Sequence, residues 1–467
     1  MGTDQTKICY IGGGSRNWAW VLMQDLAFEK EIRGAVELYD LKHEDAQTNA
    51  VIGNRLMEKN NAGHWSFHAN SSLADALSGS DFVVVSILPG DFEEMAVDVH
   101  APEKYGIYQS VGDTAGAGGI MRAMRTIPQF RDIAGAVKKY APGAWVINYT
   151  NPMSVCTRTL YKEFPQIKAF GCCHEVFNTQ MLLAAILEEA GLAPFGSIKR
   201  EEINVNVLGI NHFTWIDRAF WKDIDIFPYF KKFAGKYADT GFQKAKAATT
   251  FAAGSAVIEP DETERLKFFG SSERVKIDLF RRYGLIAAAG DRHLAEFCPH
   301  SWYLSSPEET EKWGFALTPV SWRITDREKL KQKANAYSDG MPMIPFESGE
   351  EGIKIIKALI GMGNIVTNVN LPNSGQIPNL PVSSVVETNA LFSCGGIQPL
   401  VTGALPHDIL ALIMPHVLAY EGIIEAVFEN DMEKAFRVFS HDLAVQALPL
   451  SDARALFDDM CAKTQKK

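Results

Sequence analysis

The order of apolar runs, glycines and helical patterns at the start of the chain limits it to a narrow set of folds. A short apolar run at residues 7–11 leads into Gly12-Gly13-Gly14, and a helical pattern follows over residues 17–28. A second apolar run, at residues 35–40, ends in an acid. Strand, glycine turn, helix and strand in this order predict the βαβ unit of a parallel sheet.

The glycine turn also indicates what this unit binds. Glycines let the backbone approach a pyrophosphate at the N-terminus of a helix, and an acid at the end of the second strand suits an adenosine ribose. Gly12, Gly14, Ser15 and Asp40 are therefore candidate residues for binding a dinucleotide, although Asn17 stands at the third glycine position of the usual fingerprint. The alternative is a glycine-rich turn without a ligand.

Continued alternation predicts the fold class, which is α/β. Further apolar runs at residues 81–88, 144–150 and 168–173 are separated by helical patterns. They predict one doubly wound Rossmann-type domain of six strands over residues 1–195.

A second domain is expected after the Gly- and Pro-containing stretch at residues 191–196. An alternating run at residues 203–210, a helical and charged region at residues 230–300 and an amphipathic helix at residues 407–430 follow. We expect an α+β domain over residues 196–467 that serves substrate binding and oligomerisation.

Composition excludes several function classes. Lys and Arg number 46 against 56 Asp and Glu, a net charge of −10, so a nucleic-acid partner is disfavoured. The N-terminus shows no secretory signal, and no uninterrupted apolar run approaches the ~18 to 20 residues that span a bilayer. Seven scattered cysteines favour a reducing compartment. We expect a cytoplasmic protein with no membrane partner.

The stretch Gly171-Cys172-Cys173-His174-Glu175-Val176 lies where the last strand of the first domain ends. Ligands of open α/β sheets bind outside the carboxyl ends of the strands. A thiol, an imidazole and a carboxylate are therefore placed here for chemistry. The alternative is a buried structural cysteine pair beside a helix cap.

Polar residues follow two other strands. Asn148, Thr150 and Asn151 end the strand at residues 144–150 and are binding candidates, with a simple N-cap role as the alternative for Asn151. His212 follows the strand at residues 203–210, and its alternative is a core histidine packed by its aromatic neighbours.

Two further segments suggest a ligand. The Gly-rich residues 112–119 precede Arg122 and Arg125, which suits an anionic or hydroxyl-rich ligand, with a flexible loop and solvated arginines as the alternative. Residues 364–381, rich in Asn, Gly and Pro, predict a long loop that lines a site.

In this order the motifs strongly resemble glycoside hydrolase family 4, the NAD-dependent glycosidases, over nearly the whole chain. The resemblance implies an architecture similar to lactate and malate dehydrogenases, NAD and a divalent metal (usually Mn²⁺) as cofactors, a small glycoside as substrate, and a dimer or tetramer. Its carriers are Ile11-Gly12-Gly13-Gly14-Ser15, Leu38-Tyr39-Asp40, Gly112-Asp113-Thr114 with Gly118-Gly119, Arg125-Thr126-Ile127-Pro128, Asn148-Tyr149-Thr150-Asn151-Pro152-Met153, Cys173-His174, Gly209-Ile210-Asn211-His212-Phe213, and Asn379-Leu380-Pro381 followed by Val386-Glu387.

The resemblance also implies roles for individual residues. In the family, NAD oxidises the sugar C3 hydroxyl, a base removes the C2 proton, the aglycone leaves, water adds and the ketone is reduced again. Cys173 and His212 would bind the metal, His174 would donate a proton to the leaving group, and Asn151 would bind the sugar. Asn148 would contact the cofactor. Ligand softness alone would favour zinc over manganese.

The residue at the position of the catalytic base, which removes the C2 proton, differs from the family pattern. Many members carry a tyrosine after a glycine near positions 284–286, where this chain has Gly284-Leu285-Ile286. Tyr283 is adjacent and is our candidate, with Asp291 and His293 as alternatives.

The substrate prediction follows from Cys-His-Glu-Val, which is similar to the α-galacturonidase subgroup, whereas His174 argues against a 6-phosphoglycoside. A uronate carboxylate would suit Arg292 or Arg122, and a structural ion pair is the alternative for either. α-Glucuronides, α-galactosides and α-glucosides stay open as substrates. Hypotheses from other classes are an NAD-dependent 2-hydroxy acid dehydrogenase and a nucleotide-sensing binding protein.

Overall fold

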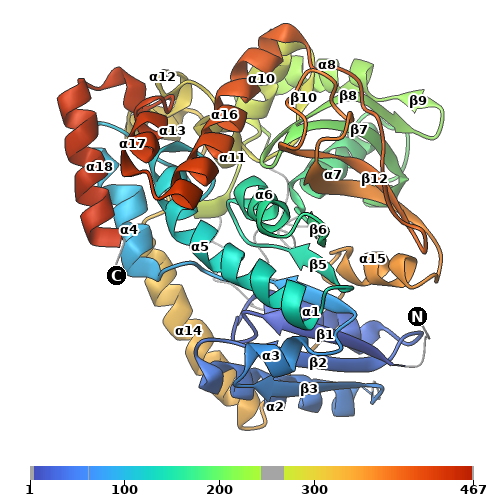
Figure 1. Ribbon diagram of the computed structural model, residues 1–467. Coiled ribbons are helices and arrows are strands. Elements are labelled where there is room, and N and C mark those ends of the chain that lie inside the picture. Colours follow the sequence, from blue (N-terminus) through green and yellow to red (C-terminus); the bar gives the residue numbers. More distant parts are fainter. Residues whose placement is uncertain (1–4, 61–62, 243–267, 465–467) are drawn as a thin grey trace.

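The computed structural model describes residues 5–60, 63–242 and 268–464 of this chain (Figure 1). Its first six strands are parallel and lie in the order β3-β2-β1-β4-β5-β6, the order of a doubly wound dinucleotide-binding sheet. The strands are β1 (Thr6–Ile11), β2 (Gly34–Tyr39), β3 (Trp65–Asn70), β4 (Phe82–Val85), β5 (Trp145–Asn148) and β6 (Lys168–Gly171). The predicted α/β class with a Rossmann-type N-terminal part is confirmed.

Helices connect these strands and cover the sheet because apolar residues on one side of each helix pack against apolar strands such as the fully buried β4. The connecting helices are α1 (Trp18–Phe28), α2 (His43–Lys59), α3 (Leu73–Leu77), α4 (Phe92–His100), η1 (Pro102–Tyr105), α5 (Gly116–Tyr140), α6 (Met153–Glu163) and α7 (Glu175–Glu189).

The same sheet continues with strands from the C-terminal half of the chain. Strand β11 (Ile365–Pro372) joins β6 in antiparallel pairing at Asn370 and Gly171, and β12 (Val385–Ser393) and β13 (Gly396–Pro399) extend the edge. The prediction of a loop over residues 364–381 was therefore wrong for its first half. A sheet edge supplies the hydrogen-bond partners of this Asn-rich segment, which its composition does not reveal. The domain division at residue 195 stays a prediction, and this sheet crosses it.

A second, antiparallel sheet is built from β7 (Ile203–Ile210), β8 (Phe213–Trp221), β9 (Ile224–Asp225) and β10 (Ile286–Ala287). The other helices pack on one of the two sheets or on other helices. Part of the predicted helical region, residues 243–267, lies outside the described residues. These helices are η2 (Arg200–Glu202), α8 (Phe227–Tyr237), α10 (Arg274–Tyr283), α11 (Asp291–Phe297), α12 (His300–Tyr303), α13 (Pro307–Lys312), α14 (Val320–Ser338), α15 (Gly352–Leu359), α16 (His407–Glu429), α17 (Met432–Ser440), η5 (Val445–Ala447) and α18 (Leu450–Thr464).

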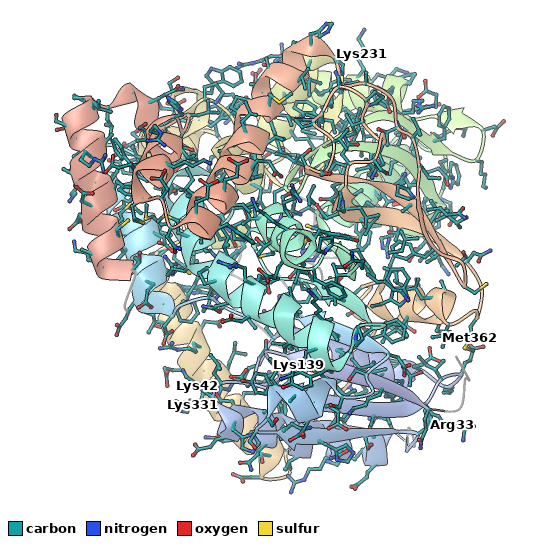
Figure 2. The ribbon with its side chains drawn as sticks, viewed as in Figure 1. Arg33, Lys42, Lys139, Lys231, Lys331 and Met362 are labelled. Carbon is teal, nitrogen blue, oxygen red and sulfur yellow. The ribbon has the colours of Figure 1, made fainter. Side chains whose placement is uncertain are left out.

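Helix α14 runs along α2 and α4 at the margin of the molecule (Figure 1). Figure 2 shows Lys331 of this helix and Lys42, both exposed, at the outer surface. The opposite side of α14 buries Val320, Ala334 and Tyr337. The helix therefore packs one side against α2 and α4 and leaves the other side to solvent.

Half of the predicted Gly-rich loop is the first turn of α5. Residues 116–119 are helical, and a Cβ at Gly118 would lie 2.7 Å from the carbonyl oxygen of Asp98 in α4. A Cβ at Gly119 would lie 2.5 Å from the carbonyl carbon of Thr114. These glycines therefore allow close packing of α5 against the preceding backbone, so the prediction of a loop was wrong for residues 116–119.

Helix α16 is long and apolar enough to cross a membrane by length and composition. However, one face of it, with Ile409, Ile413, Val417 and Ile424, is buried in the same core cluster as helix α5. Figure 1 shows α16 beside α17, which packs against it. Residues 407–429 are therefore a helix with one buried face, as the amphipathic pattern predicted.

The ion pair between Asp98 and Arg125 generates a stability prediction. Asp98 is fully buried in α4, and Arg125 Nη1 of α5 lies 2.9 Å from its Oδ1. Burial raises the pKa of Asp98 although Arg125 opposes this rise, so the pair itself adds little stability. Breaking it leaves a buried guanidinium alone, and Asp98→Ala should lower the free energy of unfolding by about 3 to 5 kcal/mol in chemical denaturation.

The double variant Asp98→Ala/Arg125→Met is the control for this prediction. It removes both charges and should recover most of the loss. A double variant that is no more stable than Asp98→Ala would contradict the assignment to an unpaired charge.

Candidate active site

The glycine turn after β1 has the close approach that a dinucleotide needs. Gly12 has φ of 94°, and a Cβ on it would lie 2.0 Å from the carbonyl oxygen of Ser86. The backbone nitrogen of Gly14 donates to Asp40 Oδ2 at 3.0 Å. The turn, the first residue of α1 (Trp18) and the end of β2 thus form one surface at the point where the strand order reverses. A bound dinucleotide fits this surface.

Two other predicted binding residues lie at the end of β5. The side chain of Asn148 is fully buried and closes its own turn, since its Oδ1 accepts from Thr150 N at 2.9 Å. Asn151 is half-buried, its carbonyl accepts from Arg122 Nε at 3.1 Å, and its Oδ1 is buried with no partner among the described residues. Asn151 therefore retains an acceptor for a ligand, whereas the Asn148 side chain is engaged.

Cys173 and His212 face a common environment, although 39 positions separate them in the chain. His212 sits at the tip of the β7–β8 hairpin with φ of 64°, and its Nδ1 lies 3.2 Å from Thr114 Oγ1. A positive φ in a non-glycine residue is strained and often marks a functional position. The contact at Nδ1 leaves Nε2 of His212 for a ligand.

The charges around this pair favour a cation. Burial, then Glu387 and Glu175, raises the pKa of the Cys173 thiol well above its usual value, and a bound cation would offset this effect. Asn211, which precedes His212, is fully buried, and its Oδ1 has no partner among the described residues. In the described part of the chain no group of three or more His, Cys, Asp or Glu has the arrangement of a metal site. A cation held by Cys173 and His212 alone would keep positions open for water or substrate.

Glu387 supports this environment from β12. Its Oε1 accepts from Asn368 Nδ2 at 2.7 Å, and its Oε2 accepts from Asn211 Nδ2 at 3.2 Å. The same Asn368 amide donates to the carbonyl of Cys173 at 3.1 Å. The C-terminal strands therefore hold the backbone of Cys173 and the residue before His212 in place.

Glu175 connects the start of α7 with the start of α11. Its Oε2 accepts from the backbone nitrogen of Gly290 at 2.8 Å, and its Oε1 lies 3.7 Å from His293 Nε2. The His293 ring lies 4.1 Å from the His212 ring, centroid to centroid. Burial opposes the charge of Glu175, but the three nearby histidines outweigh it and lower its pKa to about 2. Glu175 therefore stays ionised.

His174 is paired with Glu350, a residue that sequence reasoning missed. His174 Nδ1 lies 3.1 Å from Glu350 Oε1, and each side chain is 12% exposed. Burial disfavours the imidazolium, but the hydrogen bond and charge of Glu350 outweigh it and raise the pKa of His174 to about 9. The ring of Trp18 lies 5.8 Å from the His174 ring. His174 is thus a protonated imidazole beside the candidate dinucleotide surface.

The segment that carries Glu350 is held from two sides. Asp25 of α1 accepts from the backbone nitrogen of Ser348 at 3.0 Å and from its hydroxyl at 2.7 Å. Arg200 donates to the carbonyl of Gly349 at 2.9 Å. Only the acidic composition of residues 347–351 hinted at a role, because the contacts join residues far apart in the chain.

The structure does not bring two of the candidate bases to this cluster. The Tyr283 ring packs on Trp215 with its centroid 5.7 Å away, among Arg282, Asp278 and Asp408. Asp291 is fully buried, and its Oδ1 accepts from the backbone nitrogen of Lys276 at 3.1 Å. His293 is the one of the three that lies against His212. The role of Tyr283 as base stays a prediction.

Arg292 is mostly engaged with the protein itself. Its Nη2 donates to the carbonyl of Ser110 and to Thr318 Oγ1, and Ser110 Oγ in turn donates to the carbonyl of Arg292. Its guanidinium also lies 4.9 Å from the Phe269 ring centroid. Its predicted role in substrate binding stays a prediction.

Comparison with known proteins gives a consistent result. The sequence profile of the family 4 glycosyl hydrolases matches residues 7–189, and the profile of that family's C-terminal domain matches residues 207–445. The alpha-galacturonidase of Thermoanaerobacter italicus is 51% identical over 456 residues, which cover 97% of this chain and 95% of that protein.

Solved structures agree with this result. A Bacillus subtilis crystal structure described as glucosidase lplD has a TM-score of 0.89 at 47% identity, covering 98% of this chain and 100% of that one. A 6-phospho-alpha-glucosidase from gut microorganisms, in complex with NAD and Mn²⁺, has a TM-score of 0.80 at 19% identity, covering 99% and 98%. The second likeness shows the shared fold.

Asp25 generates a prediction on the pH dependence of stability. Burial raises its pKa to about 6, although both hydrogen bonds from Ser348 oppose this rise. A carboxyl whose folded pKa exceeds its unfolded value stabilises the fold below about pH 4 and loses this contribution as pH rises through about 6. Asp25→Asn removes this titration. The free energy of unfolding of the variant minus that of the wild type should therefore rise by about 1 to 3 kcal/mol between pH 4.5 and pH 7.5.

Denaturation at a series of pH values measures this difference. Asn keeps an oxygen that accepts from Ser348 N, so the contact to residues 348–351 is retained. A difference between variant and wild type that does not change with pH would contradict the raised pKa.

Proposed function

The chain belongs to family 4 of the glycosyl hydrolases, and from this we propose that it cleaves α-galacturonides with the help of NAD and a divalent metal ion, for which Mn²⁺ is the first candidate. The observation that carries the proposal is the nearness of three features: the glycine turn with Trp18, the protonated His174 beside Trp18, and Cys173 and His212, which Asn211, Glu387 and Asn368 connect. The galacturonide follows from the likeness to the alpha-galacturonidase of Thermoanaerobacter italicus.

The residues present fit both cofactors. Gly12, Gly14, Ser15 and Asp40 would hold NAD at the turn after β1, where a Cβ on Gly12 would meet backbone. The thiolate of Cys173 and the imidazole of His212 would hold the metal, next to the unpartnered Asn211 Oδ1. When bound, NAD supplies redox chemistry at the sugar C3, and the metal supplies Lewis acidity at the sugar oxygens.

The chain's own groups would move the protons. His174 donates a proton to the leaving oxygen, because Glu350 holds its Nδ1 and leaves Nε2 to face the substrate. Asn151 offers its unpartnered Oδ1 to a sugar hydroxyl. Of the three candidate bases for the C2 proton, His293 has the geometry that fits best, because it lies between Glu175 and His212.

Removing each cofactor tests the reaction class. Hydrolysis of 4-nitrophenyl α-D-galacturonide should fall to background after chelation of the metal or removal of NAD, and adding back Mn²⁺ and NAD should restore it, because each supplies a separate part of the chemistry. NADH should not accumulate, since oxidation and reduction cancel within a turnover.

Two outcomes would overturn parts of this proposal. Accumulation of NADH in proportion to substrate consumed would indicate a dehydrogenase. Good turnover of a neutral α-galactoside with little turnover of the galacturonide would show that the substrate assignment is wrong.

Glu350→Gln tests the role of His174 through the leaving group. Glutamine keeps a hydrogen-bond acceptor but removes the charge that keeps His174 protonated. We expect kcat/KM for a methyl α-galacturonide, whose leaving group needs a proton, to fall by roughly 10- to 100-fold or more. The fall for the 4-nitrophenyl glycoside should be only a few-fold, because its leaving group departs without protonation.

Glu347→Gln is the matched control, since Glu347 is exposed and lies three positions away in the same segment. It should leave both rates unchanged. If Glu350→Gln lowered kcat/KM equally on the two substrates, the effect would be structural and would contradict the assignment of His174 as proton donor.

A further inference from the structure

In the described part of the chain, three arginines lie near enough to Asp113 to interact with its charge. Arg122 comes from α5, Arg292 from α11 and Arg323 from the first turn of α14. Burial opposes the charge of Asp113, but Arg122, His212 and His293 outweigh it and lower its pKa to about 2. Burial raises the pKa of the nearby Glu296 to about 8, so its carboxyl adds little negative charge at neutral pH.

The guanidinium of Arg122 has hydrogen-bond donors without an acceptor among the described residues. Only 6% of it is exposed, and its Nε donates to the carbonyl of Asn151 at 3.1 Å. Its two terminal amino groups have no hydrogen-bond partner among the residues that the structure describes, and no ion pair within 4.0 Å joins it to Asp113. Arg122 therefore holds the backbone of the candidate sugar-binding Asn151 and keeps one edge of its guanidinium for a ligand.

Arg323 has fewer hydrogen-bond partners than Arg122 among the described residues. Its guanidinium lies 5.5 Å from the Phe269 ring centroid, the same ring that Arg292 approaches to 4.9 Å. Within residues 5–60, 63–242 and 268–464 it has no hydrogen bond or ion pair. Burial lowers the pKa of Arg323, Asp113 and Asp326 oppose this, and Arg122 lowers it further.

Arg292 differs from Arg323 because the protein itself accepts hydrogen bonds from its guanidinium. Its Nη2 donates to the carbonyl of Ser110 and to Thr318 Oγ1, and both Arg292 and Arg323 lie beside the Phe269 ring. Arg292 therefore holds the loop at Ser110 and lies, like Arg323, beside the Phe269 ring. Arg122, beside the backbone of Asn151, and Arg323, beside Phe269, have few partners of their own, which indicates an anion as the missing ligand.

We propose that Arg122 and Arg323 together bind the carboxylate of the uronate, and that Arg323 is the residue that selects a uronide over the neutral sugar. This inference rests on the proposed function, because it names the groups that read the C6 carboxylate of the same substrate. The planar guanidinium presents paired N–H donors that match the two oxygens of a carboxylate, and Asn151, held by Arg122, places the sugar beside it.

Arg323→Gln tests the assignment by the ratio of two substrates. The variant should lower kcat/KM for 4-nitrophenyl α-D-galacturonide by about 100-fold or more, because a charged hydrogen bond to the carboxylate is lost. The rate for 4-nitrophenyl α-D-galactoside, which has no carboxylate, should change by no more than a few-fold. Arg323→Lys keeps the charge but loses the paired donors, so it should fall between the wild type and Arg323→Gln.

Arg327→Gln is the matched control, one helical turn further along α14, where Arg327 pairs with Asp91 outside the arginine group. It should keep the wild-type ratio of the two substrates. A second readout is the shift in melting temperature caused by D-galacturonate against that caused by D-galactose. The galacturonate shift should disappear in Arg323→Gln and persist in Arg327→Gln.

The outcomes separate this inference from the proposed function. A wild-type enzyme that hydrolyses the galacturonide, with an Arg323→Gln variant of unchanged substrate ratio and unchanged galacturonate shift, would overturn the role of Arg323 alone. A wild-type enzyme that does not hydrolyse the galacturonide would overturn the proposed function. An Arg323→Gln variant that loses activity on both substrates equally would show that the residue is structural.

Discussion

The hydrogen bond from the backbone of Gly290 to Glu175 is the contact on which the arrangement of the site depends. Glu175 begins the helix that follows the last parallel strand, whereas Gly290 begins the helix of His293 in the C-terminal half. Because the carboxylate is buried, it needs these donors and the nearby imidazoles to stay ionised. The two halves of the chain are thus joined beside Cys173 and His174, and beside His293, whose ring packs on that of His212.

The mixed sheet makes this junction rigid. Antiparallel β11 and β12 extend the parallel sheet at β6 and bring Asn368 and Glu387 behind the backbone of Cys173. A loop would have left the Glu387 side chain free to turn to water. In a buried strand its two oxygens are fixed by Asn211 and Asn368, so the environment of the thiol is set by the sheet itself.

The sequence predicted what depends on local order and missed what depends on contacts between distant segments. Apolar runs and glycines located five of the six parallel strands, the glycine turn and the Cys173-His174 stretch, since each is a short-range pattern. Glu350 and Arg323 come from the segment before α15 and from α14, more than 140 positions from His174, and only the acidic composition around Glu350 hints at a role. Residues 116–119 and β11 were read as loops because composition cannot show the backbone against which they pack.

The two histidines at the end of β6 and at the β7–β8 hairpin show how the fold separates chemical roles. Glu350 outweighs burial at His174 and raises its pKa to about 9, whereas burial and His293 lower the pKa of His212 to about 3. One imidazole is therefore kept protonated, which suits a proton donor, and the other is kept neutral, which suits a metal ligand. Both states come from the neighbours that the fold supplies, because the two side chains are chemically the same. Loss of Glu350 would lower the pKa of His174 toward that of His212, although both histidines would remain unchanged in the sequence.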